Sequence, residues 1–226
     1  MSEWVKLKAS DGHEFDAYVA RPEGTPIAGL VVVQEIFGVN AHIQSVADGY
    51  AKDGFLAVAP ALFDRHERGV DLGYEGADRD KAMSFFPKLK IDDAVLDTEA
   101  ALKYVREQTG KKSGVIGYCF GGSITWLAAT RLDPDAAVGY YGGQIANFVQ
   151  EEPRCLVMLH FGKLDQHIPK EVVDKIAAAH PEVEIYSYDG AGHGFNCDMR
   201  ASYEPVSAKL ARERSLAFLK KNLASL

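Results

Sequence analysis

The sequence predicts an α/β fold in which a mostly parallel sheet carries helices on both faces. Short, continuously apolar runs, typical of strands buried on both sides, alternate with longer segments whose apolar residues recur at helical spacing. Strands that alternate with helices form parallel sheets covered on both faces. With 226 residues, 47% of them hydrophobic and 25% charged, the chain is expected to form one domain over residues 1–226.

The N-terminal segment is expected to form an antiparallel hairpin. Trp4–Ala9 and Glu14–Ala20 alternate apolar and polar residues, and Asp11–Gly12 between them is a common turn dipeptide. After the hairpin, one strand leads into the motif around Cys119. The other apolar runs predict strands at Ala28–Val33, Phe55–Ala59, Ala136–Tyr140, Cys155–His160 and Val183–Tyr188.

Helices are expected between these strands. Asp53–Gly54 ends the first of them, and Pro169 suits the first turn of a later one. The predicted helices are His42–Lys52, Asp92–Glu107, Gly121–Thr130, Pro169–Ala179 and Ser207–Leu223. Ligands bound by such a fold collect at the carboxyl ends of the parallel strands.

Composition argues against several classes of partner. The net charge of −7 disfavours nucleic acid and anionic membranes, although one local arginine can still attract a small anion. The N-terminus lacks a signal-peptide pattern, and no apolar run approaches the roughly 20 residues that span a bilayer. Three scattered cysteines do not make a disulfide framework. We therefore expect a cytoplasmic protein, and both a monomer and a small homo-oligomer remain open.

The most informative motif is Gly117–Tyr118–Cys119–Phe120–Gly121, which ends an apolar run and precedes a predicted helix. This pattern is typical of a nucleophile elbow, with cysteine in place of the usual serine. Glycine has no Cβ, so Gly117 and Gly121 would relieve the clash of a tight turn. The turn would place the Cys119 sulfur at a helix N-terminus. The alternative is a buried cysteine in an ordinary strand-to-helix turn.

A cysteine nucleophile needs a base and an acid that orients the base. Asp165 follows one predicted strand, and His193 lies in the glycine-flanked loop after the last one. Nucleophile, aspartate and histidine then occur in the chain order of α/β-hydrolases. Taken singly, Asp165 could be a turn residue and His193 a solvated loop residue. His167, close to Asp165, is the second candidate for the base.

The segment Gln34–Glu35–Ile36–Phe37–Gly38 directly follows a buried strand. In α/β-hydrolases this loop supplies one donor of the oxyanion hole, so we expect the Ile36 and Phe120 amides to be the two donors. A carboxylate at Glu35 beside a thiol would oppose formation of the thiolate. The alternative for Glu35 is an ion pair with a basic residue.

The sequence does not predict a metal or cofactor site. No cysteine and histidine residues are spaced as metal ligands, and neither a Gly-x-Gly-x-x-Gly turn after a strand nor a Walker motif is present.

Together, the glutamate motif, the cysteine elbow, the Asp165 loop and Ala191–Gly192–His193 resemble the dienelactone hydrolase family (carboxymethylenebutenolidases) along nearly the whole chain. The resemblance implies an α/β-hydrolase fold and a carboxylic ester hydrolase that converts dienelactone to maleylacetate in the catabolism of aromatic compounds. It also implies a nucleophile at Cys119, a base at His193, an orienting acid at Asp165 and a thioester intermediate. Glu35 would control ionisation of the thiol.

Members of this family hold the substrate carboxylate with arginines. Arg79 matches one of them, and Phe37 and Phe86 are expected to line the substrate site. A second arginine usually follows the histidine by four positions, where this chain has Cys197; Arg200 comes three residues later. We therefore expect that the second arginine is missing.

The expected substrate is a small, anionic lactone or ester, because the chain after Tyr141 has room for a short loop and not for a cap domain. Two alternatives stay open. The protein could hydrolyse another small ester or thioester on the same scaffold, or it could be a thiol sensor without catalytic activity.

Overall fold

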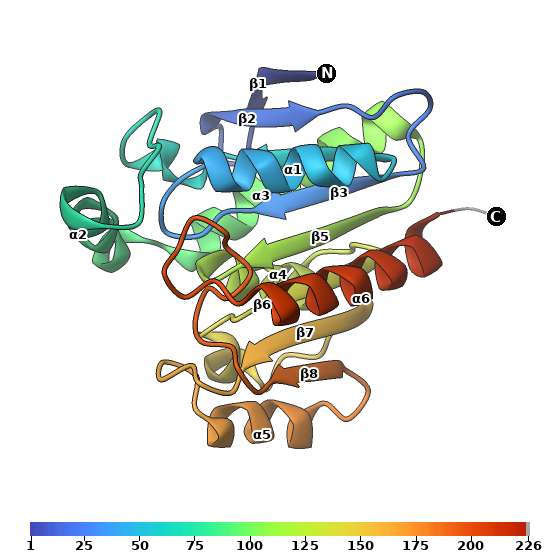
Figure 1. Cartoon of the computed structure of the whole chain (residues 1–226). Helices are drawn as coiled ribbons and strands as arrows, with labels where there is room; N and C mark the ends of the chain where they lie inside the picture. The colour runs from blue at the N-terminus through green and yellow to red at the C-terminus, as the bar shows by residue number, and fades with distance from the viewer. Residues whose placement is uncertain (225–226) are drawn as a thin grey trace.

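The computed structural model describes residues 1–224, which form a layered structure around one eight-stranded sheet (Figure 1). The strand order is β1-β2-β4-β3-β5-β6-β7-β8. Neighbours from β4 to β8 are parallel, whereas β2 is antiparallel to both β1 and β4. The strands are β1 (Ser2–Lys8), β2 (Glu14–Ala20), β3 (Ala28–Val33), β4 (Phe55–Pro60), β5 (Ser113–Tyr118), β6 (Ala136–Tyr140), β7 (Leu156–Gly162) and β8 (Glu184–Tyr188). The predicted sheet and N-terminal hairpin are confirmed.

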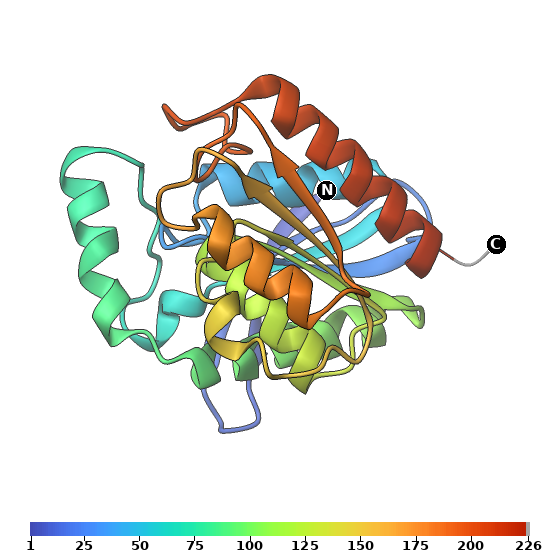
Figure 2. The ribbon, with the colours of Figure 1, turned by 90° about the horizontal axis from the view of Figure 1, so that it is seen from below.

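Helices cover both faces of the sheet, as predicted. Figure 2 shows α1 and α6 on one side and α3, α4 and α5 on the other. Their bounds agree with the predicted ones to within a few residues. The helices are α1 (Ala41–Lys52), α2 (Gly76–Phe85), α3 (Ile91–Thr109), α4 (Phe120–Arg131), α5 (Lys170–Ala179) and α6 (Pro205–Leu223). Across residues 1–224, none of the helices combines the length and the apolarity that a bilayer crossing requires.

Apolar spacing does not predict α2. Only Ala82 and Phe85 of this helix are buried, so its sequence carries no apolar stripe that would reveal it. In Figure 1 α2 lies beyond the carboxyl ends of the parallel strands. It therefore belongs to the edge of the sheet where ligands are expected.

The centre of the sheet holds the core. Every residue of β3, β4 and β5 is buried, which explains why these strands read as continuous apolar runs. Helix α4 is buried from Phe120 to Thr130, and Trp126 in its middle is fully enclosed. Because α4 has no solvent-facing side over this length, its N-terminus is held firmly against the end of β5.

Candidate active site

Cys119 occupies a strained turn between β5 and α4. Its φ is 58° and its ψ −118°, and residues other than glycine rarely have a positive φ. A Cβ on Gly117 would lie 2.0 Å from the carbonyl oxygen of Gly121. A Cβ on Gly121 would lie 2.3 Å from the carbonyl oxygen of Val33. Both glycines are therefore required for the close approach of the turn, as the sequence predicted.

Cys119, His193 and Asp165 form a connected chain of side chains. The Nε2 atom of His193 lies 3.2 Å from the Cys119 sulfur, and its Nδ1 lies 2.7 Å from Oδ2 of Asp165. The other carboxylate oxygen of Asp165 accepts the backbone N–H groups of His167 and Ile168. His193, and not the second candidate His167, is thus the histidine that links the aspartate to the thiol.

The side chains of Asp165 and Cys119 stabilise the protonated, imidazolium form of His193. Burial disfavours this charge, but the hydrogen bonds to Asp165 and Cys119 outweigh burial and raise the pKa of His193 to about 10. Burial raises the pKa of the Asp165 carboxyl group, but the hydrogen bond and charge of His193, together with the backbone N–H of His167, lower it by more, so the pKa is lower than the usual value. The Asp165 side chain is fully buried, so this ion pair is shielded from solvent.

The two amides expected to form an oxyanion hole are free to donate. Within residues 1–224, neither the Ile36 nor the Phe120 backbone N–H has a protein acceptor. Both residues line the same cavity as Cys119. The buried Gln34 side chain braces the first loop, because it donates to the Glu35 carbonyl oxygen and accepts from the Leu62 N–H.

Glu35 is fully buried and makes an ion pair, which is the alternative that the sequence left open. Tyr74 donates its hydroxyl to one carboxylate oxygen at 2.6 Å, and Arg200 approaches the other at 3.2 Å. The hydrogen bonds that Glu35 makes to residues 1–224 do not include one to Cys119. Burial opposes the charge of Arg200, but Glu35 outweighs it and raises the pKa of the guanidinium.

The expectation that the second arginine is missing is wrong, because Arg200 lines the site. The loop after His193 makes two successive turns, in which the Cys197 N–H donates to Gly194 and the Arg200 N–H donates to Cys197. These turns return the Arg200 guanidinium to Gly194, where a Cβ would meet it at 2.6 Å. Arg200 lies three residues later in the chain than the expected arginine, but the two turns shorten the loop and bring its guanidinium back to the site. The number of residues between His193 and Arg200 does not show this.

A cavity of about 400 Å³ opens above the Cys119 sulfur. Arg79 of α2 and Arg200 contribute positive charge to it, and no carboxylate from residues 1–224 lines it. Its apolar wall includes Phe37, Met83 and Phe86. The sequence-based placement of Arg79, Phe37 and Phe86 around one site agrees with this cavity.

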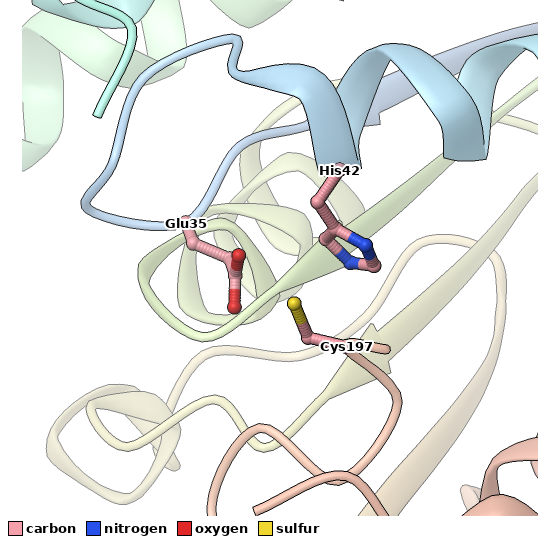
Figure 3. Close-up of side chains that lie close together, drawn as sticks. All are labelled: Glu35, His42 and Cys197. Carbon is pink, nitrogen blue, oxygen red and sulfur yellow. The ribbon is translucent and has the colours of Figure 1, made fainter. Parts of the chain in front are cut away.

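The fold also gathers a buried set of metal-ligating side chains that spacing in the sequence could not show. Within residues 1–224, Glu35, His42 and Cys197 place one possible ligand atom each within 4.8 Å of one another (Figure 3). They come from the loop after β3, the first turn of α1 and the loop after β8.

The fold and the chain order of these residues are those of an α/β-hydrolase. The model of the dienelactone hydrolase family matches residues 15–223. A carboxymethylenebutenolidase from Pseudomonas putida is 32% identical over 97% of this chain and 96% of its own length. A Klebsiella pneumoniae protein assigned as a dienelactone hydrolase superposes with a TM-score of 0.84 at 29% identity, over 98% of this chain and 99% of that one.

The chain therefore belongs to the dienelactone hydrolase family, and it is a hydrolase that acts on ester or lactone bonds of small molecules. A dienelactone hydrolase-like promiscuous phosphotriesterase from metagenomic libraries shares the fold, with a TM-score of 0.78 at 19% identity over 99% of both chains. The predicted fold class and family are confirmed, and a thiol sensor without catalytic activity finds no support.

Proposed function

We propose that this hydrolase opens a small lactone that carries a carboxylate, of the dienelactone type, through a thioester on Cys119. The observation that carries the proposal is the unbroken series of contacts from Asp165 through His193 to the Cys119 sulfur, at the base of a cavity with two arginines. The relative from Pseudomonas putida named carboxymethylenebutenolidase supports the same substrate class.

In the first half of the proposed reaction, the Cys119 sulfur attacks the lactone carbonyl carbon as a thiolate, with the thiol proton held on His193. The Ile36 and Phe120 amides stabilise the oxyanion that develops on the carbonyl oxygen. When the ring C–O bond breaks, the ring oxygen leaves as an enolate and accepts the proton held on His193, which restores the neutral imidazole. In the second half, His193 removes a proton from water, which attacks the thioester and releases the thiolate.

The arginines provide the basis for an anionic substrate. Arg79 and Arg200 both line the cavity, and Arg200 is held between Glu35 and the rings of Phe37 and Tyr74. A substrate carboxylate that binds Arg200 would compete with Glu35 for the guanidinium. Glu35 would then leave its resting position, where its negative charge opposes the thiolate, so that substrate binding controls how readily the Cys119 thiol passes its proton to His193.

A panel of acidic lactones, their methyl esters and p-nitrophenyl acetate tests the substrate class. Wild-type protein should turn over acidic enol lactones fastest, and Cys119→Ala should abolish turnover of all of them. A preference for p-nitrophenyl acetate over every acidic lactone would instead favour a different small ester as substrate. Retained activity in Cys119→Ala would remove the proposed nucleophile.

Arg79→Gln tests the carboxylate contact, with Lys81→Gln as its matched control. Both residues lie on α2, but Lys81 pairs with Glu67 and does not line the cavity. A charge-assisted hydrogen bond contributes about 1.5–3 kcal/mol, so Arg79→Gln should raise KM for an acidic lactone by roughly 10- to 100-fold. KM for the methyl ester should stay nearly constant, and so should both values in Lys81→Gln. An equal effect on acid and ester would contradict the contact.

Glu35→Gln tests the control of the thiol. If the carboxylate suppresses ionisation in the resting enzyme, iodoacetamide should alkylate Cys119 faster in this variant than in the wild type. Cys119→Ala gives the background from Cys155 and Cys197. An unchanged or slower rate would count against a suppressing role for Glu35.

A further inference from the structure

We propose that Glu35, His42 and Cys197 bind one divalent cation of borderline softness, such as Zn²⁺, beside the catalytic cavity, and that the ion inhibits hydrolysis by holding Glu35. The inhibitory effect rests on the proposed function of Glu35. The binding of the ion does not.

The geometry of the three side chains suits a compact metal site. Figure 3 shows the Glu35 carboxylate, the His42 ring and the Cys197 sulfur converging on the same small volume, and all three residues are buried. Their ligand atoms lie within 4.8 Å of one another. Bonds of about 2.0–2.3 Å in a tetrahedral zinc site separate ligand atoms by about 3.3–3.8 Å, so side-chain shifts of about 1 Å would complete the site.

His42 supplies an independent reason to expect a ligand. Only 2% of this residue is exposed, yet within residues 1–224 neither ring nitrogen has a hydrogen-bond partner. A buried polar atom without a partner costs about 1–3 kcal/mol. The nearest carboxylate is that of Asp198, 3.5 Å from Nδ1. A carboxylate in that position can orient a metal-bound imidazole through one nitrogen while the other binds the ion.

The chemistry of the donors selects the class of ion. A thiolate and an imidazole favour Zn²⁺ over Mg²⁺ or Ca²⁺, which prefer oxygen ligands. A cysteine binds a metal ion as the thiolate, and Cys197 is fully buried. Binding would therefore displace one proton from the sulfur.

One of the three side chains, His42, also borders a cavity on the other side from the catalytic one, whereas Glu35 and Cys197 do not line it. This second cavity, of about 260 Å³, is lined by His42 and Asp198 and opens to the surface. The two carboxylate oxygens of Glu35 each accept one hydrogen bond, so each retains capacity for a further contact. An ion bound there would hold the carboxylate in place and prevent the movement that substrate binding requires.

Binding is tested by titrating Co²⁺ into Cys119→Ala protein, which lacks the thiol that could hold metal together with His193. We expect one ion per chain, with a sulfur-to-cobalt charge-transfer band in the near ultraviolet and visible bands of tetrahedral Co²⁺. Adding Cys197→Ala or His42→Gln should weaken binding at least tenfold, and Cys155→Ala is the matched thiol control. Circular dichroism and thermal melting establish that each variant is folded, and Cys197→Ser replaces Cys197→Ala if the latter is not.

Two results would overturn the site: no thiolate band in Cys119→Ala protein, or a band that survives the loss of Cys197 or His42. Inhibition is measured separately with Zn²⁺ and an acidic lactone, the substrate class whose carboxylate would displace Glu35 from Arg200. Zn²⁺ that saturates the site should lower wild-type turnover at least tenfold, and His42→Gln should resist the same concentration. Equal inhibition of both proteins would overturn the inhibitory effect, while the cobalt spectrum reports the site independently of any activity.

Discussion

The Asp165→Asn variant is the most direct test of the linked Cys119, His193 and Asp165 side chains. In the wild type, Oδ2 of Asp165 accepts the proton on Nδ1 of His193 at 2.7 Å, which leaves Nε2 facing the Cys119 sulfur at 3.2 Å. An asparagine can keep its carbonyl oxygen on the His167 and Ile168 amides. Its NH₂ group would then face Nδ1 and favour the tautomer that carries its proton on Nε2. That tautomer cannot accept a proton from the thiol.

The size of the effect follows from these contacts. A charge-assisted hydrogen bond contributes about 1.5–3 kcal/mol, and restoring the productive tautomer would leave two donors facing each other at a further cost of about 1–3 kcal/mol. The sum, about 2.5–6 kcal/mol, corresponds to a loss of roughly 10²- to 10⁴-fold, since each tenfold change equals about 1.4 kcal/mol. The fold should persist because the backbone contacts of residue 165 remain.

The assay is kcat/KM with p-nitrophenyl acetate and an acidic lactone, together with the thermal midpoint. Asp189→Asn is the matched control, because Asp189 is exposed, pairs with Lys163 and lies in the loop that leads to His193. If Asp165→Asn is folded and its kcat/KM stays within about threefold of the wild-type value, the reasoning is refuted. An equal loss in Asp189→Asn would also refute it.

Three further predictions concern stability. Gly121→Ala would place its Cβ 2.3 Å from the Val33 carbonyl oxygen, and overpacking of this kind should cost about 1–3 kcal/mol in urea unfolding; an unchanged midpoint would show that the turn can relax. Tyr74→Phe removes a 2.6 Å hydrogen bond from the buried Glu35 carboxylate, and we expect it to lower the free energy of unfolding in urea by about 1–3 kcal/mol. An unchanged free energy of unfolding would mean that another donor replaces the hydroxyl. The pKa of His193 is raised from 6.5 to about 10, so its stabilising contribution is complete below pH 6.5 and is lost as pH rises through 10. The stability advantage of wild type over His193→Gln should therefore shrink between pH 7 and pH 10, and a constant difference would contradict this pKa.

Much of the fold was predictable because burial leaves a local signature. Strands buried on both faces must be apolar throughout, and β3, β4 and β5 are. Helix α2 escaped prediction because it buries only Ala82 and Phe85 and otherwise faces solvent. Helices are predicted from the spacing of their apolar residues, so a helix without an apolar stripe cannot be found in this way.

The sequence by itself determined the elbow around Cys119, since only glycines at 117 and 121 allow backbone to pass so closely. It also indicated which loops bring Asp165 and His193 to the same edge of the sheet, because parallel strands end there. Tertiary structure alone decided the position of Arg200, which depends on two turns that shorten its loop in space. It also decided that Glu35 pairs with Arg200 and lies beside His42 and Cys197. Such contacts join segments far apart in the chain, and no local pattern of residues records the distances between them.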